Sequence, residues 1–367
     1  MSADFELKIR IGNVLWSVGC YTRLEVKLAE YSVSTGASLE LTDLDVLGIR
    51  VQKDLSIDYL VADCTSNRHL LRSPIQRVFW LRGVMEFFGA SKAYLGLHGK
   101  DGAAVAIPGF QRTVADRLGV TILNEDNLSN LERRLVTSET TQLRLSRAES
   151  WRYLEGNLAT LSKGMGPLLQ FRKHDYWMNE SHQNLHALIS LVDRHRKLFD
   201  ERNRMHRALA LDLLSLFAFS VLHMSAYALR TNPEDPENEL RAYFYGGYAE
   251  MARRQAIVDN ISRLIGGRPC QASFLERELQ LDPEYLRSLF DLAFRLLNKP
   301  VDASQILRYL QVLLFETAPS GGQEGGGADP LQAGFSDVTK KLARDIAKFF
   351  SGATGLPDTL FQEIHSN

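Results

Sequence analysis

The chain has 367 residues, of which 45% are hydrophobic and 24% are charged. This is an ordinary balance for a globular protein, and the length is sufficient for two domains. The formal net charge of -1 excludes a global basic field, so any affinity for nucleic acid must come from a local patch. Three cysteines without a CxxC pair exclude a cysteine-rich zinc site and a disulfide framework. Together with an N-terminus that lacks the apolar core of a signal peptide, they predict a cytoplasmic protein.

Residues 1–135 are predicted to form a domain in which helices flank a mixed sheet. Pro74 suits the first turn of a helix and Gly89 suits its C-cap, while runs rich in β-branched and apolar residues predict strands. The expected elements are a helix at 14–34, strands at 38–51 and 57–65, a helix at 74–88, a strand at 92–99, a helix from 109, a strand at 120–123 and the start of another helix.

Beyond about residue 140 the strand signals stop, and residues 140–318 are predicted to form an all-helical domain. The fold class is therefore α+β, mostly α overall. A glycine-rich linker is expected at 319–330 and an amphipathic C-terminal helix within 331–367. Residues 213–229 are apolar enough to suggest a membrane span. They are shorter than the roughly 20 residues that a bilayer needs, so a buried helix and no membrane contact are expected. The long helical runs are expected at 141–163, 180–230, 238–266, 271–298 and 302–317.

Two aspartates stand on neighbouring predicted strands, Asp45 on the first and Asp63 on the second. Carboxylates brought together at the ends of adjacent strands raise each other's pKa unless a cation lies between them, and hard ions such as Mg²⁺ bind such oxygen pairs. The spacing alone equally allows two solvated residues at strand ends. The pair is a candidate metal site, with Mg²⁺ or Mn²⁺ as the cofactor.

The order of these motifs over residues 15–132 resembles that of the PD-(D/E)XK, or restriction-endonuclease-like, nuclease superfamily. The resemblance implies that Asp45 and Asp63 bind the metal and that Glu25 lies on the first helix of the domain. Gln76 and Trp80 resemble the Gln-x-x-x-Tyr feature of the RecB-like branch, with Trp in place of Tyr.

The sequence departs from that family at Thr65, where a lysine would activate the attacking water. Threonine carries no charge, so the resemblance implies a degenerate catalytic site made of Asp45, Asp63, Thr65, Glu25 and Gln76. A migrated cation would instead keep the site active. The candidates for such a cation are Lys27, Lys53, Arg68 and His69.

Aromatic residues on the predicted helix at 74–88 lie at helical spacing, and Phe79, Trp80, Phe87 and Phe88 are expected in the core. Cys64 alternates away from Asp63 and is expected to be a small buried residue rather than a nucleophile.

A basic run at residues 193–207 could track the phosphates of a nucleic acid or could be a solvated helix face with internal ion pairs such as Asp200–Arg204. Arg202 and His206 are one residue short of the spacing in HEPN ribonucleases, and His182 and His186 lie one helical turn apart without the glutamate of an HExxH zinc motif. The cations of the run are Arg194, Arg196, Lys197, Arg202, Arg204 and Arg207.

Three functions follow from these patterns. The first is a nuclease-fold subunit that binds nucleic acid or a protein partner without cutting well, in a bacterial DNA-processing or antiphage-defence complex; this context is implied by the resemblance alone. The second is an active Mg²⁺-dependent endonuclease with a migrated cation. The third is a helical protein-interaction scaffold. The expected partners are proteins of a multi-subunit complex, with DNA as a further candidate.

Overall fold

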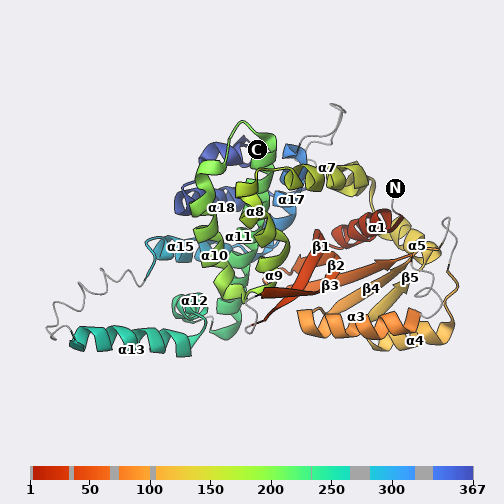
Figure 1. Ribbon diagram of the computed structural model, residues 1–367, viewed down its shortest axis with the longest axis horizontal. Helices are drawn as coiled ribbons and strands as arrows, with labels where there is room; N and C mark the ends of the chain where they lie inside the picture. Colours follow the sequence, from red (N-terminus) through yellow and green to blue (C-terminus); the bar gives the residue numbers. More distant parts are fainter. Residues whose placement is uncertain are drawn as a thin grey trace.

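The computed structural model has an N-terminal mixed sheet flanked by helices and a larger all-helical region, which confirms the predicted fold class (Figure 1). The structure describes residues 3–32, 37–66, 74–99, 105–232, 234–264, 282–318 and 334–366.

The sheet has five strands in the order in which they occur in the chain. The first three pair antiparallel, and the third, fourth and fifth pair parallel. The strands are β1 (Tyr21–Ser32), β2 (Ala37–Val51), β3 (Ile57–Thr65), β4 (Lys92–Leu97) and β5 (Val120–Leu123).

Helices cover both faces of the sheet (Figure 1). On one face, α1 (Ala3–Ser17) and α5 (Glu125–Leu135) close a small core around Leu15, Val46 and Leu60. On the other, α3 (Pro74–Phe88) and α4 (Gly109–Arg117) pack on the sheet through side chains such as Leu81 and Met85. The helix at 74–88 ends as expected, because Gly89 adopts a φ of 77° that favours glycine.

The helix predicted at residues 14–34 is wrong. Helix α1 ends at Ser17, Gly19 turns the chain with a φ of 95°, and residues 21–32 form the edge strand β1. From Arg23 to Leu28 polar and apolar residues alternate strictly, and this period of two belongs to a strand rather than a helix. Glu25 therefore lies on a strand and not on the first helix.

Two of the four aromatic side chains expected in the core are on the surface. Phe79 is 58% exposed and Phe87 is 55% exposed, because both lie on the side of α3 that faces away from the sheet. Trp80 and Phe88 are half-buried and pack against the core. Cys64 is buried as expected, and burial raises the pKa of its thiol well above the ordinary value.

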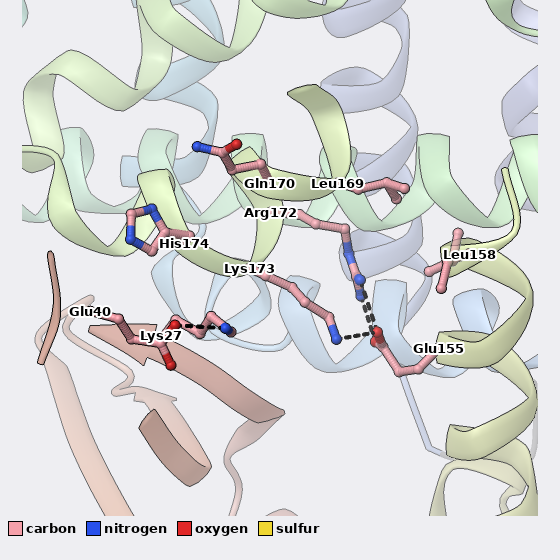
Figure 2. Close-up of a pocket in the computed structure, with 10 residues that line it drawn as sticks. Lys27, Glu40, Glu155, Leu158, Leu169, Gln170, Arg172, Lys173 and His174 are labelled. Atoms are coloured by element: carbon pink, nitrogen blue, oxygen red, sulfur yellow. Dashed lines mark hydrogen bonds and ion pairs between the residues drawn. The ribbon is translucent and has the colours of Figure 1, made fainter. Parts of the chain in front are cut away.

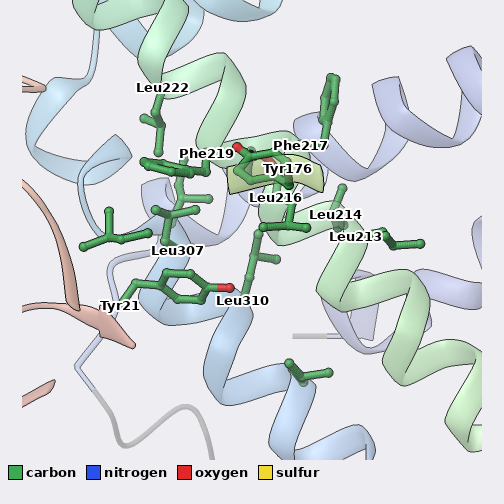
Figure 3. Close-up of a cluster of buried hydrophobic side chains, with 14 of the residues drawn as sticks. Tyr21, Tyr176, Leu213, Leu214, Leu216, Phe217, Phe219, Leu222, Leu307 and Leu310 are labelled. Carbon is green, nitrogen blue, oxygen red and sulfur yellow. Dashed lines mark hydrogen bonds between the residues drawn. The ribbon is translucent and has the colours of Figure 1, made fainter. Parts of the chain in front are cut away.

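The helical half is built around α11 (Arg204–Thr231), whose most apolar stretch is 94% buried. This helix is long and apolar enough to cross a membrane, but its burial inside the protein confirms the expectation of a core helix. Phe217 and its neighbours pack with Leu307 and Leu310 of α17 (Ile306–Thr317), and Tyr21 of β1 joins the same cluster (Figure 3).

Several of the remaining helices of this half pack around α11 (Figure 1). They include a π-helical turn, η4 (Phe171–Asp175). The α-helices are α6 (Ser138–Gln142), α7 (Ala148–Ala159), α8 (Gly166–Gln170), α9 (Tyr176–Met178), α10 (Ser181–His195), α12 (Pro236–Tyr245), α13 (Tyr248–Leu264), α15 (Leu286–Leu297), α16 (Pro300–Ala303), α17 (Ile306–Thr317), α18 (Asp337–Thr354) and α19 (Gln362–Ser366). The short 3₁₀ turns are η2 (Arg144–Ser146), η3 (Lys163–Met165), η5 (Arg196–Leu198) and η7 (Asp358–Phe361).

The helix expected near the C-terminus is α18, which packs on the helical core through Ile346 and Phe350. The glycine-rich segment predicted as a linker at 319–330 and part of the helical run predicted at 271–298 lie outside the described residues.

Polar contacts join the two halves along β1. Asp212 of α11 accepts hydrogen bonds from Arg23 of β1 and Arg172 of η4, at 2.5 Å in each case. Gln311 of α17 pairs with the backbone N–H and C=O of Thr22, at 3.0 and 2.6 Å. These groups are buried, so each of these bonds satisfies a group that water cannot reach.

Candidate functional site

Asp45 and Asp63 occupy neighbouring positions of β2 and β3, just past the last paired residues, Val46 and Ala62. Beyond that pair a side chain replaces the backbone as the acceptor, because Oδ2 of Asp45 accepts a hydrogen bond of 2.6 Å from the backbone N–H of Cys64. Both carboxylates are buried, with 9% and 5% of the residue exposed. The structure thus brings together the two aspartates expected to form the site.

Lys8 of α1 neutralises Asp45. Its Nζ lies 2.7 Å from Asp45 Oδ1 and 3.1 Å from Glu25 Oε1. Burial alone would lower the pKa of Lys8, but the hydrogen bonds and charges of these two acids raise it above its ordinary value. Burial raises the pKa of Asp45 although Lys8 opposes that shift, and the charge of Asp63 raises it further.

Glu25 lies on β1 between Leu24 and Val26, which pair with Val46 and Leu44 of β2. This places Glu25 beside Asp45 in the sheet. Its φ of 54° is uncommon for a residue other than glycine and marks a local irregularity of the strand. Glu25 therefore joins the site, but from a strand.

Arg77 of α3 neutralises Asp63 from the other face of the sheet. The guanidinium donates two hydrogen bonds, Nε to Oδ2 at 2.7 Å and Nη2 to Oδ1 at 2.5 Å. Its Cζ also lies 3.4 Å from the ring centroid of Trp80, a stacking contact that fixes the guanidinium plane. Two parallel bonds to one carboxylate make this the strong form of the ion pair.

All four carboxylate oxygens of the pair are thus bound to N–H donors: those of Asp45 to Lys8 and Cys64, and those of Asp63 to Arg77. A divalent cation coordinates through such oxygens and would bring its charge next to the two cations already bound there. The described residues contain no group of three or more His, Cys, Asp or Glu side chains placed to hold a metal. In this arrangement the residues do not fit Mg²⁺ or Mn²⁺.

The other residues predicted for the site lie in different parts of the domain. Thr65 is buried at the end of β3, opposite Leu97 of β4, whereas Gln76 is exposed on α3. Lys27 pairs with Glu40 at 2.7 Å, and Lys53 lies in the turn at the far end of β2. Arg68 and His69 lie outside the described residues.

The two cations of the site, Lys8 and Arg77, were not predicted from the sequence. A signal for Lys8 exists: it stands beside Leu7 and one turn before Ile11, at the border of the apolar face of α1. Arg77 follows Gln76 directly, one position from the expected motif.

The basic run ends α10 and leads through η5 into α11. Arg196 pairs with Asp193, and Arg207 lies 3.2 Å from Glu363. The predicted ion pair between Asp200 and Arg204 does not form, because Asp200 precedes the helix and accepts instead from the backbone of Arg202. The exposed cations of the run are Arg194, Arg196, Lys197, Arg202 and Arg204.

The histidines are used in packing contacts. Nδ1 of His206 accepts from the backbone of Asp200 at 2.8 Å, and Nδ1 of His186 contacts the hydroxyl of Tyr285 at 3.0 Å. The ring of His182 lies against Gly246 and Tyr243. These are the histidines whose spacing suggested a ribonuclease motif and a zinc pair.

Comparisons with models of protein families, with curated proteins and with solved structures find no match for this chain.

Proposed function

We propose that the protein is a nucleic-acid-binding subunit with a degenerate nuclease site, working in the cytoplasm within a larger DNA-processing or defence complex. The observation that carries the proposal is the state of the aspartate pair: each carboxylate is buried and held by its own fixed cation, Lys8 or Arg77. The complex and its bacterial setting rest on the resemblance to the PD-(D/E)XK superfamily alone.

The physical argument concerns charge. A nuclease of this type uses a divalent ion between two carboxylates to activate water and to neutralise the phosphate. Here a lysine and an arginine supply two positive charges from opposite faces of the sheet, and Thr65 supplies none. Displacing Arg77 would break two hydrogen bonds of 2.7 and 2.5 Å to a carboxylate whose side chain is only 8% exposed. These ion pairs stabilise the fold and oppose the binding of a metal ion.

The test combines a cleavage assay with a binding assay. Purified protein is incubated with plasmid and with single-stranded DNA in Mg²⁺ or Mn²⁺, and binding of Mn²⁺ is measured by calorimetry. We expect no cleavage and no Mn²⁺ binding to the aspartates, but retention of labelled DNA that weakens as salt rises.

A second candidate is an active endonuclease in which Lys8 takes the role of the missing lysine, and the 2.7 Å contact of Lys8 with Asp45 favours it. Metal-dependent cleavage that Asp63→Ala and Lys8→Met both abolish would establish this alternative and overturn the main proposal. Absence of both cleavage and DNA retention would leave only the protein-interaction scaffold.

A further inference from the structure

A hollow of about 510 Å³ lies where the two halves of the protein meet (Figure 2). Lys27 of β1 and Glu40 of β2 form one wall, and the side chains of α7 and η4 form the other. Figure 2 shows Lys173 and Arg172 reaching from η4 toward Glu155 across from that strand wall.

A second hollow of about 850 Å³ continues from the first. Both are lined by Gln170 and His174, and the second begins at Ala29, two residues beyond Lys27 on β1. It follows α10 as far as Arg194. We refer to the two together as the junction groove.

The wall of the groove contains the π-helical turn η4. Such turns are rare and occur frequently at functional sites, because they change which side chains a helix presents. Arg172, Lys173 and His174 of η4 all line the groove, but the Arg172 side chain is only 4% exposed and binds both Asp212 and Glu155, whereas that of Lys173 is 34% exposed. The turn therefore separates a structural cation from residues that a ligand can reach.

Three cations along the groove are accessible. Lys27 is 46% exposed and paired with Glu40, and Lys173 is 34% exposed and paired with Glu155. The Lys27–Glu40 pair is exposed, and such pairs contribute only about 0–1 kcal/mol, so an incoming phosphate can take Lys27. The Lys173–Glu155 pair is half-buried, but Arg172 also binds Glu155, so that carboxylate keeps a partner when Lys173 turns to a phosphate. Arg194 is exposed and donates to the backbone of Ser190, and none of the described carboxylates forms an ion pair with it.

The groove leads to the aspartate site. Lys27 lies two residues after Glu25 on β1, a rise of about 7 Å along the strand, and Lys8 joins Glu25 to Asp45. A ligand that follows the cations from Arg194 past Lys173 to Lys27 arrives at the edge of that site.

We propose that the junction groove binds one strand of nucleic acid, whose successive phosphates contact Arg194, Lys173 and Lys27. This inference rests on the proposed function and names its ligand. Hollows of about 300–1,000 Å³ accommodate ligands the size of a drug molecule, which is also the size of one or two nucleotides. A duplex, whose two grooves alone are about 6 and 12 Å wide, is larger than hollows of about 510 and 850 Å³ can hold.

The experiment measures fluorescence anisotropy of a labelled 20-nucleotide single strand, with the full chain, over a range of salt concentrations. The variants are Lys27→Gln, Lys173→Gln and Arg194→Gln, alone and combined. Lys53→Gln is the matched control, because Lys53 is an exposed lysine at the other end of β2 from Glu40. Circular dichroism melts confirm that each variant is folded.

We expect each groove variant to weaken binding several-fold and to reduce the slope of log affinity against log salt by about 0.7, the share of one phosphate contact on a single strand. The control should bind like the unmodified protein, and an unlabelled duplex should compete poorly.

Three results would overturn the inference about the groove without refuting the proposed function. If all three groove variants bind the strand normally, the protein binds nucleic acid elsewhere. If the duplex competes as well as the strand, the ligand is not single-stranded. If polyglutamate competes equally, the groove accepts an acidic protein segment. Failure of the unmodified protein to bind any nucleic acid would instead refute the proposed function itself.

Discussion

Removing the cation of the Asp63–Arg77 pair is the most direct test of the site. Asp63 has a side chain 8% exposed, and Arg77 has one 26% exposed. Taking one partner from a buried ion pair costs about 3–5 kcal/mol, because the other charge is left without compensation. Arg77 is partly solvated, so we expect Arg77→Met to lower the free energy of unfolding by about 2–4 kcal/mol.

Replacing the acidic partner, Asp63, is expected to lower the free energy of unfolding by less. In Asp63→Asn the guanidinium keeps its stacking on Trp80 and its access to water, so the loss should be about 1–2 kcal/mol. The double variant carries no uncompensated charge, and its cost should fall short of the sum of the two by about 1–3 kcal/mol. Arg82→Met is the matched control, since Arg82 lies on the same helix in an exposed pair with Glu86.

Urea unfolding followed by circular dichroism gives the free energy of unfolding of the unmodified protein, the two single variants, the double variant and the control. If Arg77→Met costs no more than Arg82→Met, or if the two single costs simply add, then Arg77 does not compensate a buried carboxylate, and the argument for a degenerate site fails. A second measurement uses the same variant: with both Asp63 oxygens released, Arg77→Met should bind Mn²⁺ more tightly than the unmodified protein.

Three further outcomes are expected. Burial lowers the pKa of His223 to about 4, so the unfolded chain takes up a proton at a higher pH than the folded protein does. The free energy of unfolding should therefore be largest above pH 6.5 and fall by up to about 3 kcal/mol between pH 6.5 and pH 4. Urea titrations at each pH should show that His223→Gln removes this loss. Gln311→Ala should lower stability by about 2–4 kcal/mol, because it leaves the buried N–H and C=O of Thr22 unpaired. Lys8→Met should cost about 2–4 kcal/mol and raise the pKa of Asp45 further, as a carboxyl NMR titration would show.

Each of these has its own control or contrary result. An unchanged pH dependence in His223→Gln would show that another group titrates. Gln183→Ala, on an exposed position of α10, should leave stability within about 0.5 kcal/mol and so isolates the effect of Gln311. A Lys8→Met variant as stable as the unmodified protein would mean that Asp45 tolerates burial without its cation.

The sequence predicted the inner strands of the sheet better than its edge strand β1. Turn residues and the runs at 38–51 and 57–65 identified β2 and β3 and the helix after them, because those signals are local. A helix was predicted in place of β1 because the periodicity of the whole run at 14–34 is mixed, although residues 23–28 alternate. The helical half covers the outer side of β1, and that burial depends on contacts with α11 and η4 more than 100 residues away.

The positions of the two aspartates could be predicted from the sequence, but the cations that pair with them could not. Alternation along β2 and β3 placed Asp45 and Asp63 side by side, and the structure agrees. Which cations meet them depends on how α1 and α3 lie across opposite faces of the sheet, and a single sequence carries no local sign of that. The same limit applies to Phe79. Helical spacing shows which residues share a face of α3, but the packing of α3 on the sheet decides which of its faces is buried.

The balance of charge at the site gives the strongest reason to connect Thr65 with Lys8 and Arg77. Lys8 and Arg77 match the two buried carboxylates of Asp45 and Asp63, so the buried part of the site is neutral, whereas the Glu25 side chain is 45% exposed and reached by water. A lysine at position 65, or a divalent ion, would add uncompensated positive charge to that buried group. Threonine at this position and two resident cations are therefore parts of one arrangement, in which the site is nearly neutral and stable as it stands.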